Sequence, residues 1–203
     1  MRLLQTSGKL QTDGTGGASQ TYNFAASLTP GSTVVLSGVQ WNSTSQKITA
    51  VSASGTSGTN DVRKTDVSGG TANNAETWSV PNVAGGSTAV VATVASTSYL
   101  SMSAEEWRGF LVGSYIDRTG TTSDSTSAAP TVTASATPTD DYELVYASFV
   151  DYIGTNWTSA TPPSGGVETF EEPNGTAHEA GSAAYKLISN GSIQSNHCRS
   201  TVC

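Results

Sequence analysis

The stretch STVVLSGVQW, from Ser32 to Trp41, decides the fold of this chain. Its apolar residues recur with a period of two, as in a β-strand, rather than with the 3.6-residue period of a helix. One face of the extended segment carries Val35, Val39 and Trp41, and the other carries Val34 and Leu36. The pattern therefore predicts a strand.

The same period recurs in PTVTASA (130–136), DYELVYASFV (141–150) and GSAAYKLI (181–188), and STAVVATVAS (87–96) is β-branched or small throughout. Turn-forming clusters such as LTPGS (28–32) and NVAGG (82–86) separate them, and no convincing helix of about ten residues intervenes. Strands without helical connections form antiparallel sandwiches or barrels. We predict an all-β chain, an antiparallel two-sheet β-sandwich that is jelly-roll-like, with roughly ten strands and extended terminal arms.

The 203 residues are predicted to form a single β-sandwich domain, 1–203. Residues 1–15 are expected to form an N-terminal arm, and residues 189–203 a C-terminal arm. The Ser/Thr-rich segment RTGTTSDSTSAAP (118–130) is interpreted as a long crossover within the sandwich rather than as a linker. Each half of the chain alone would be only a thin sheet.

The net charge and the distribution of basic residues bear on which partners the chain could bind. The formal net charge is −7, and the nine Lys and Arg residues are scattered. Without a basic stripe, neither nucleic acid nor an anionic membrane surface is expected as a partner. The start MRLLQTSGKL lacks the apolar core of a secretory signal, and no run approaches the roughly 18 apolar residues of a membrane span. The sequence therefore predicts synthesis in the cytoplasm.

A family resemblance rests on the run ETWSVPNVAGGSTAVVATVASTSYLSMSAEEWRGF (76–110). It resembles a β-sandwich (jelly-roll-like) module that recurs in bacteriophage virion structural proteins and bacterial surface proteins. Glu106, Trp107, Arg108 and Gly109 match its Glu-aromatic-x-Gly element, and DYELVYASFV and GSAAYKLISNGS (181–192) resemble two later strands. Such modules close with one more apolar strand, whereas this chain ends in IQSNHCRSTVC (193–203). The resemblance therefore suggests either an incomplete sandwich or a strand supplied by a neighbouring chain.

The adjacent glutamates in SMSAEEWRGF (101–110) raise the question of catalysis. Paired glycosidase carboxylates face each other across about 5–9.5 Å. Successive side chains of a strand point to opposite faces, so Glu105 and Glu106 cannot converge on one bond. The apolar residues that share the face of Glu106 indicate that it lies at the inner rim, bonded to a loop or to a cation. Glu106 and Trp107 are therefore interpreted as structural rim residues, with sugar binding or catalysis by Glu106 as the alternatives.

Aromatic residues at strand ends and in loops suggest a carbohydrate-binding site. Trp157 and Tyr152 lie in DYIGTNWTSATPPSGG (151–166), and Trp41 ends its strand. Such rings can stack on sugars, and loops commonly carry binding residues. The alternative is a loop that folds over the core with Trp157 as its lid. Trp78 and Trp107 are interpreted as core or inter-sheet residues.

The remaining reactive side chains do not form a recognisable site. Cys198 and Cys203 could close a disulfide or stay reduced, and their spacing with His178 and His197 matches no zinc pattern. Asp140 and Asp141 fit a turn better than a calcium site. We expect no catalytic residues, no metal and no cofactor.

Two functions follow from these observations. The first is a non-enzymatic bacteriophage virion structural protein, most simply a capsid decoration (cement) protein. It would contact other virion proteins, of capsid or tail, and copies of itself, and it would reside in the virion. The second is a carbohydrate-binding or adhesion module of a tail fibre or bacterial surface protein, with cell-surface glycans as partners.

Overall fold

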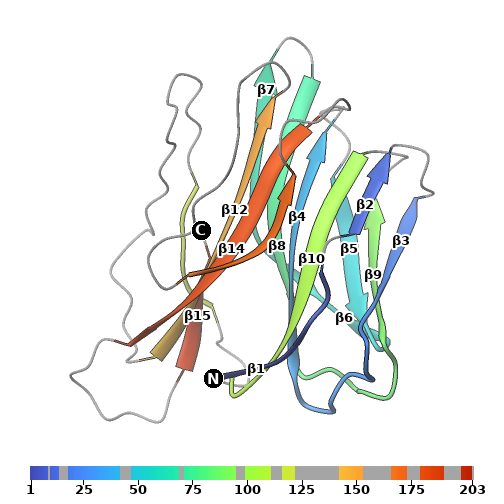
Figure 1. Cartoon of the computed structure of the whole chain (residues 1–203), viewed down its shortest axis with the longest axis vertical. Coiled ribbons are helices and arrows are strands. Elements are labelled where there is room, and N and C mark those ends of the chain that lie inside the picture. The colour runs from blue at the N-terminus through green and yellow to red at the C-terminus, as the bar shows by residue number, and fades with distance from the viewer. Residues whose placement is uncertain are drawn as a thin grey trace.

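The computed structural model describes residues 1–8, 10–13, 18–41, 47–68, 71–94, 99–110, 116–121, 142–152, 166–172, 179–189 and 198–202. This part of the chain consists of strands and connecting loops and contains no helix, so it holds no helix that could cross a membrane. The strands form three sheets, which Figure 1 shows edge-on. The all-β class and the predicted β-sandwich are confirmed.

The central sheet contains the strand predicted from STVVLSGVQW. Its order is β1 (Arg2–Thr6), β10 (Tyr99–Arg108), β4 (Thr33–Trp41), β8 (Thr71–Val80) and β7 (Thr59–Ser68), and β2 (Leu10–Asp13) also pairs with β10. All these pairs are antiparallel. The register places Val34 opposite Glu106 on one side and Val80 on the other. β4 thus lies at the centre of the sheet.

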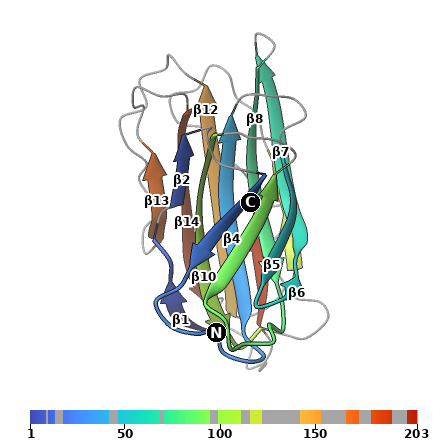
Figure 2. The same cartoon turned by 90° about the vertical axis from the view of Figure 1, so that its right-hand side faces the viewer.

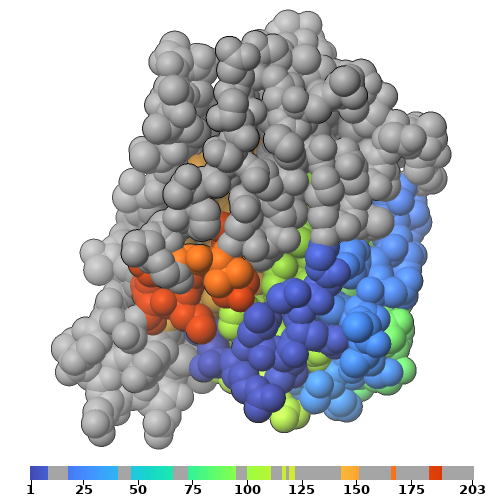
Figure 3. Space-filling view, viewed as in Figure 1, coloured from blue at the N-terminus to red at the C-terminus, as the bar shows by residue number. Residues whose placement is uncertain are grey.

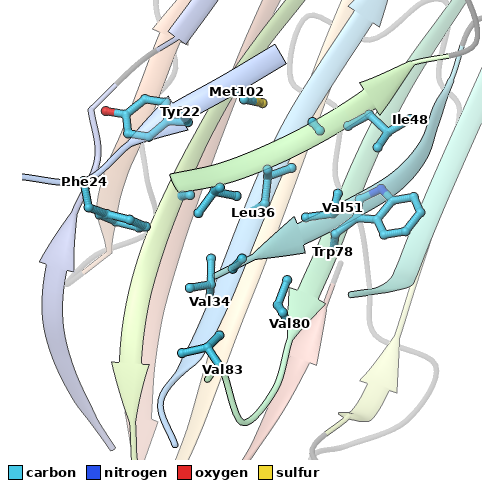
Figure 4. Packing of buried hydrophobic residues seen from close by; sticks show 14 of the residues in the cluster. Tyr22, Phe24, Val34, Leu36, Ile48, Val51, Trp78, Val80, Val83 and Met102 are labelled. Carbon is cyan, nitrogen blue, oxygen red and sulfur yellow. The ribbon is translucent and has the colours of Figure 1, made fainter. Parts of the chain in front are cut away.

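A four-stranded sheet covers one face of the central sheet. Its order is β3 (Ser19–Asn23), β9 (Ala89–Val94), β5 (Ile48–Ala53) and β6 (Thr56–Ser57). Figure 2 brings this sheet to the front. Seventeen buried residues between the two sheets form the main core, including Leu36, Trp78 and Met102 from the central sheet and Ile48 and Val51 from β5 (Figure 4). These two sheets pack face to face as a β-sandwich.

A five-stranded sheet covers the opposite face of the central sheet. Its order is β11 (Ile116–Thr119), β15 (Cys198–Val202), β12 (Tyr142–Tyr152), β14 (Glu179–Ser189) and β13 (Val167–Glu172). β15 runs parallel to both of its neighbours, and the other pairs are antiparallel. A second core joins Val35 and Trp107 of the central sheet to Leu144, Tyr146 and Tyr185. The molecule therefore has three layers, one more than the sequence predicted.

The expected terminal arms contribute strands. Arg2–Thr6 and Leu10–Asp13 both pair with β10, so the N-terminal segment lies along the central sheet. Cys198–Val202 of the C-terminal segment fills the place between β12 and β11. The C-terminal segment IQSNHCRSTVC thus contains a strand, in parallel orientation to both neighbours. Fifteen strands occur among the described residues, against roughly ten expected, because short strands such as β2, β6 and β11 carry no alternating pattern long enough to recognise.

Small polar residues explain why the third layer was not anticipated. Ser37, Thr77, Ser79, Ser101 and Ser103 alternate with the main core and are all buried. Alternation of this kind ordinarily marks a solvent-facing side. Asn73 and Asn74 illustrate the same difficulty, since they are polar and are nevertheless buried strand residues of β8.

Candidate functional site

Three glutamates are buried in the central sheet and are its most distinctive chemical feature. Glu76 of β8 and Glu105 and Glu106 of β10 are each about 1% exposed. A buried carboxylate is costly unless hydrogen bonds or an opposite charge compensate it. The partners of each glutamate therefore show what it does.

Glu106 binds a loop and a neighbouring strand. Its Oε1 accepts hydrogen bonds from the Thr29 backbone N–H and the Ser32 hydroxyl, both at 2.6 Å. Its Oε2 accepts from Nε2 of Gln5 on β1, also at 2.6 Å. The amide of Gln5 in turn bonds the backbone of Ala26. Glu106 thus fastens the loop between β3 and β4 to the edge of the central sheet.

Glu105 lies on the opposite face of β10, between the central and five-stranded sheets. The Tyr146 hydroxyl donates to its Oε2 at 3.2 Å, and Trp107 Nε1 donates to the Tyr146 oxygen at 2.6 Å. The rings of Trp107 and Tyr146 pack edge to face at 6.4 Å. Burial raises the pKa of Glu105 from 4.5 to about 8, although hydrogen bonds from Tyr146 and Ser103 act in the opposite direction. At neutral pH this carboxyl group keeps its proton.

Glu76 is the acceptor of a cluster that joins the central and four-stranded sheets. Its Oε2 accepts from Arg63 Nη2 at 2.7 Å and from Trp78 Nε1 at 2.8 Å, and its Oε1 accepts from the Ile48 backbone N–H at 3.1 Å. Arg63 Nη2 also donates to the Ile48 carbonyl at 2.6 Å, and the guanidinium lies 5.9 Å from the centre of the Trp78 ring. The ion pair holds the first residue of β5 against β8.

Asp61 is a fourth partly enclosed acid. It lies at the irregularity in the pairing of β7 with β8, where the Ser79 hydroxyl donates to its Oδ1 at 2.8 Å. Burial raises its pKa from 3.8 to about 7, while the bond from Ser79 lowers it. Its Oδ2 makes no hydrogen bond within the described part of the chain.

The hydrogen bonds of these acids hold elements of the fold together. Glu105 bonds the five-stranded sheet and Glu106 bonds the loop before β4, from opposite faces of one strand, so they do not face a common substrate. Glu76 bonds Arg63, Trp78 and a backbone N–H. Over the described ranges, no group of three or more His, Cys, Asp or Glu side chains is arranged to hold a metal ion.

The aromatic residues expected to bind carbohydrate are only partly described. Trp41 and Tyr152 are the last residues of β4 and β12. Val39 and Val150, two residues before them, belong to one apolar cluster between the sheets. The backbones of Trp41 and Tyr152 therefore come to the same end of the molecule, at the top of Figure 1. Trp157 lies outside the described residues.

The structure describes some of the other side chains that the sequence singled out, and others lie outside the described residues. Trp78 belongs to the main core and Trp107 lies between two sheets, as predicted. Cys198 begins β15, while Cys203 lies outside the described residues, as do His178, His197, Asp140 and Asp141.

Sequence analysis missed the roles of Glu76 and Arg63. Thirteen positions separate them, and only the register of β7 against β8 places them opposite each other. One signal was available: Glu76 and Trp78 are two residues apart in ETWSV, so a strand places both on the same face. An acid beside a core tryptophan needs a donor, and the indole N–H is one.

Comparison with known proteins gives no family to which the chain can be assigned. No family model, curated protein or solved structure matches it.

Proposed function

We propose that this chain is a non-enzymatic structural protein of a bacteriophage particle, most simply a decoration protein that binds an assembled capsid and stabilises it. It contacts other virion proteins and copies of itself. The observation that carries the proposal is the use of the acidic side chains. Glu76, Glu105 and Glu106 are buried and bonded within and between the sheets, so the residues best suited to chemistry support the architecture.

In this proposal, the chain assembles by pairing a sheet edge with another chain. An edge strand presents backbone N–H and C=O groups that can pair with another chain. β13 is at the edge of the five-stranded sheet. Val167, its first residue, is 47% exposed, and Leu187 on the adjacent β14 is 48% exposed. Figure 3 shows residues of this sheet, in orange and red, at the surface beside the blue N-terminal residues. Within the described part of the chain, this edge combines unpaired backbone groups with exposed apolar surface.

Reconstitution tests the proposal. The purified chain is mixed with capsids, lacking this protein, of the phage whose genome encodes it. We expect co-sedimentation at a fixed ratio and a higher capsid melting temperature, because a ligand that binds only the assembled state stabilises that state. Failure to co-sediment, or binding without a change in melting temperature, contradicts a decoration role.

Two variants locate the contact. Replacing both Val167 and Leu187 by Glu should abolish capsid binding, since charge opposes burial at the edge. Thr21→Glu is the matched control, because Thr21 is exposed on β3 at an edge of the four-stranded sheet. Circular dichroism must show that both variants are folded. Equal binding by the two variants contradicts the assignment of this edge.

A carbohydrate-binding role is the second candidate. It is favoured by one observation, that the ends of β4 and β12 bring the backbones of Trp41 and Tyr152 to one end of the molecule. Retention on immobilised cell-surface polysaccharide should then fall strongly in Trp157→Ala and in Tyr152→Ala. Trp78→Phe, a core change, should leave retention intact. Retention that is unaffected by all three changes contradicts this site.

A further inference from the structure

The five-stranded sheet is a self-contained layer. All of its strand pairings among the described residues join strands between Ile116 and Val202 to one another. The other two sheets are built from residues 2–108 and share the seventeen-residue core. The third layer is therefore attached through its face, and the first two sheets form a complete sandwich without it.

Among the described residues, the contact between this layer and the central sheet mixes apolar and polar side chains. Its apolar part consists of a cluster with five buried members and another with two, together with partly buried residues packed against them. Around these lie buried hydroxyl groups such as those of Ser37, Ser101 and Thr77, the last of which is 3.3 Å from the Ser148 hydroxyl of β12. Within the described residues, the buried Ser37 Oγ and Asn73 Oδ1 make no hydrogen bond. Polar contacts of this kind resemble an interface between domains more than a core.

Glu105 of β10 lies within this contact, where it meets Tyr146 of the five-stranded sheet. Among the side chains that the structure describes, Tyr146 from β12 and Tyr185 from β14 are the titratable groups that face it across the layers. Its neighbours in the central sheet, Thr6 on β1 and Val35 on β4, carry no charge. No cation is among the causes acting on Glu105, so ionisation would place an uncompensated charge between the sheets.

We propose that the five-stranded sheet is a detachable layer, and that loss of the Glu105 proton releases it from the central sheet while the remaining sandwich stays folded. Separation exposes Glu105 to water, where its carboxyl group ionises readily. The closed form keeps the proton and the open form loses it. Rising pH therefore favours the open form. The device is independent of the function proposed above.

Hydrogen exchange on the full chain tests this proposal. Exchange rates are measured by mass spectrometry from pH 6 to pH 9 and divided by the intrinsic rate at each pH, which gives protection factors. Between pH 7 and pH 8, protection in β12 and β14 should fall up to about tenfold, the effect of one proton released on opening. At every pH, protection in β12 and β14 should lie well below that in β5 and β9, because the layer opens without unfolding the remaining sandwich. Equal protection in all three sheets, or no fall in β12 and β14, overturns the proposal.

Two neighbouring variants identify the responsible group. Glu105→Gln keeps the shape of the side chain without a titrating proton, so protection in β12 and β14 should no longer depend on pH between 7 and 8. Glu106→Gln is the matched control on the other face of the same strand, and it should retain the tenfold fall. A Glu105→Gln protein that retains the fall overturns the proposal. If this variant does not fold, the wild-type series decides alone.

Discussion

The ion pair between Arg63 and Glu76 gives the sharpest quantitative prediction. The Glu76 side chain is 0% exposed and that of Arg63 is 23% exposed, with 2.7 Å between Nη2 and Oε2. Arg63→Met removes the cation but preserves a long apolar stem. The carboxylate then remains buried without its opposite charge, which costs about 3–5 kcal/mol in comparable pairs. Loss of the guanidinium over Trp78 adds about 0.5–1 kcal/mol.

We therefore expect Arg63→Met to lower the free energy of unfolding by about 4 kcal/mol. Urea unfolding followed by circular dichroism measures this change, with the slope against urea concentration checked for two-state behaviour. Lys64→Met is the matched control. It removes one positive charge from the next residue of β7, so we expect a change within about 0.5 kcal/mol.

The double variant Arg63→Met with Glu76→Gln completes the test. Because it removes both charges, it should be more stable than the sum of the two single losses predicts, by about 2 kcal/mol. A loss below about 1 kcal/mol in Arg63→Met, the range of exposed ion pairs, would refute the argument that the pair is desolvated. Additive single effects would refute it as well.

Two further predictions concern pH and the backbone. The pKa of Glu105 is raised to about 8 and that of Asp61 to about 7, so at intermediate pH the native state holds protons that the unfolded state has released. The free energy of unfolding should therefore fall as pH rises from about 4 to 8, by up to about 1.4 kcal/mol per pH unit for each group. Unfolding in urea at each pH measures this, and Glu105→Gln should remove the decline between pH 7 and 8; stability that rises over the whole range contradicts the assignment. Gly85 has φ of +79°, and an added Cβ would lie 2.7 Å from the Pro30 ring, so Gly85→Ala should cost about 2 kcal/mol or more. Gly86→Ala at φ of +82° meets no atom within 4 Å and should cost about 1 kcal/mol, and equal losses would show that the contact with Pro30 is unimportant.

The strands of the main sandwich could be predicted because their side chains follow elementary alternation. Val34 and Leu36 face one layer and Val35 faces the other, as STVVLSGVQW indicates. The same rule separated Glu105 from Glu106. In both cases the backbone geometry of a single strand determines the answer, so no knowledge of distant residues is needed.

The third layer could not be predicted by that rule. Ser37, Ser101 and Ser103 are small and polar, so a sequence cannot distinguish a face covered by another sheet from one open to water. The hydrogen-bond partners of the buried acids could not be predicted from the sequence either. Glu106 meets Gln5 across 101 positions and Glu105 meets Tyr146 across 41, and only the sheet order brings them together.

We propose that this chain acts as an assembled component of a phage particle. The most direct test of this proposal is the copy number of the chain in purified, intact particles, measured by quantitative mass spectrometry against the major capsid protein. The account predicts a fixed whole-number relation between the two proteins, set by the symmetry of the particle. Absence of the chain from intact particles, with the protein found free in the lysate, would contradict it.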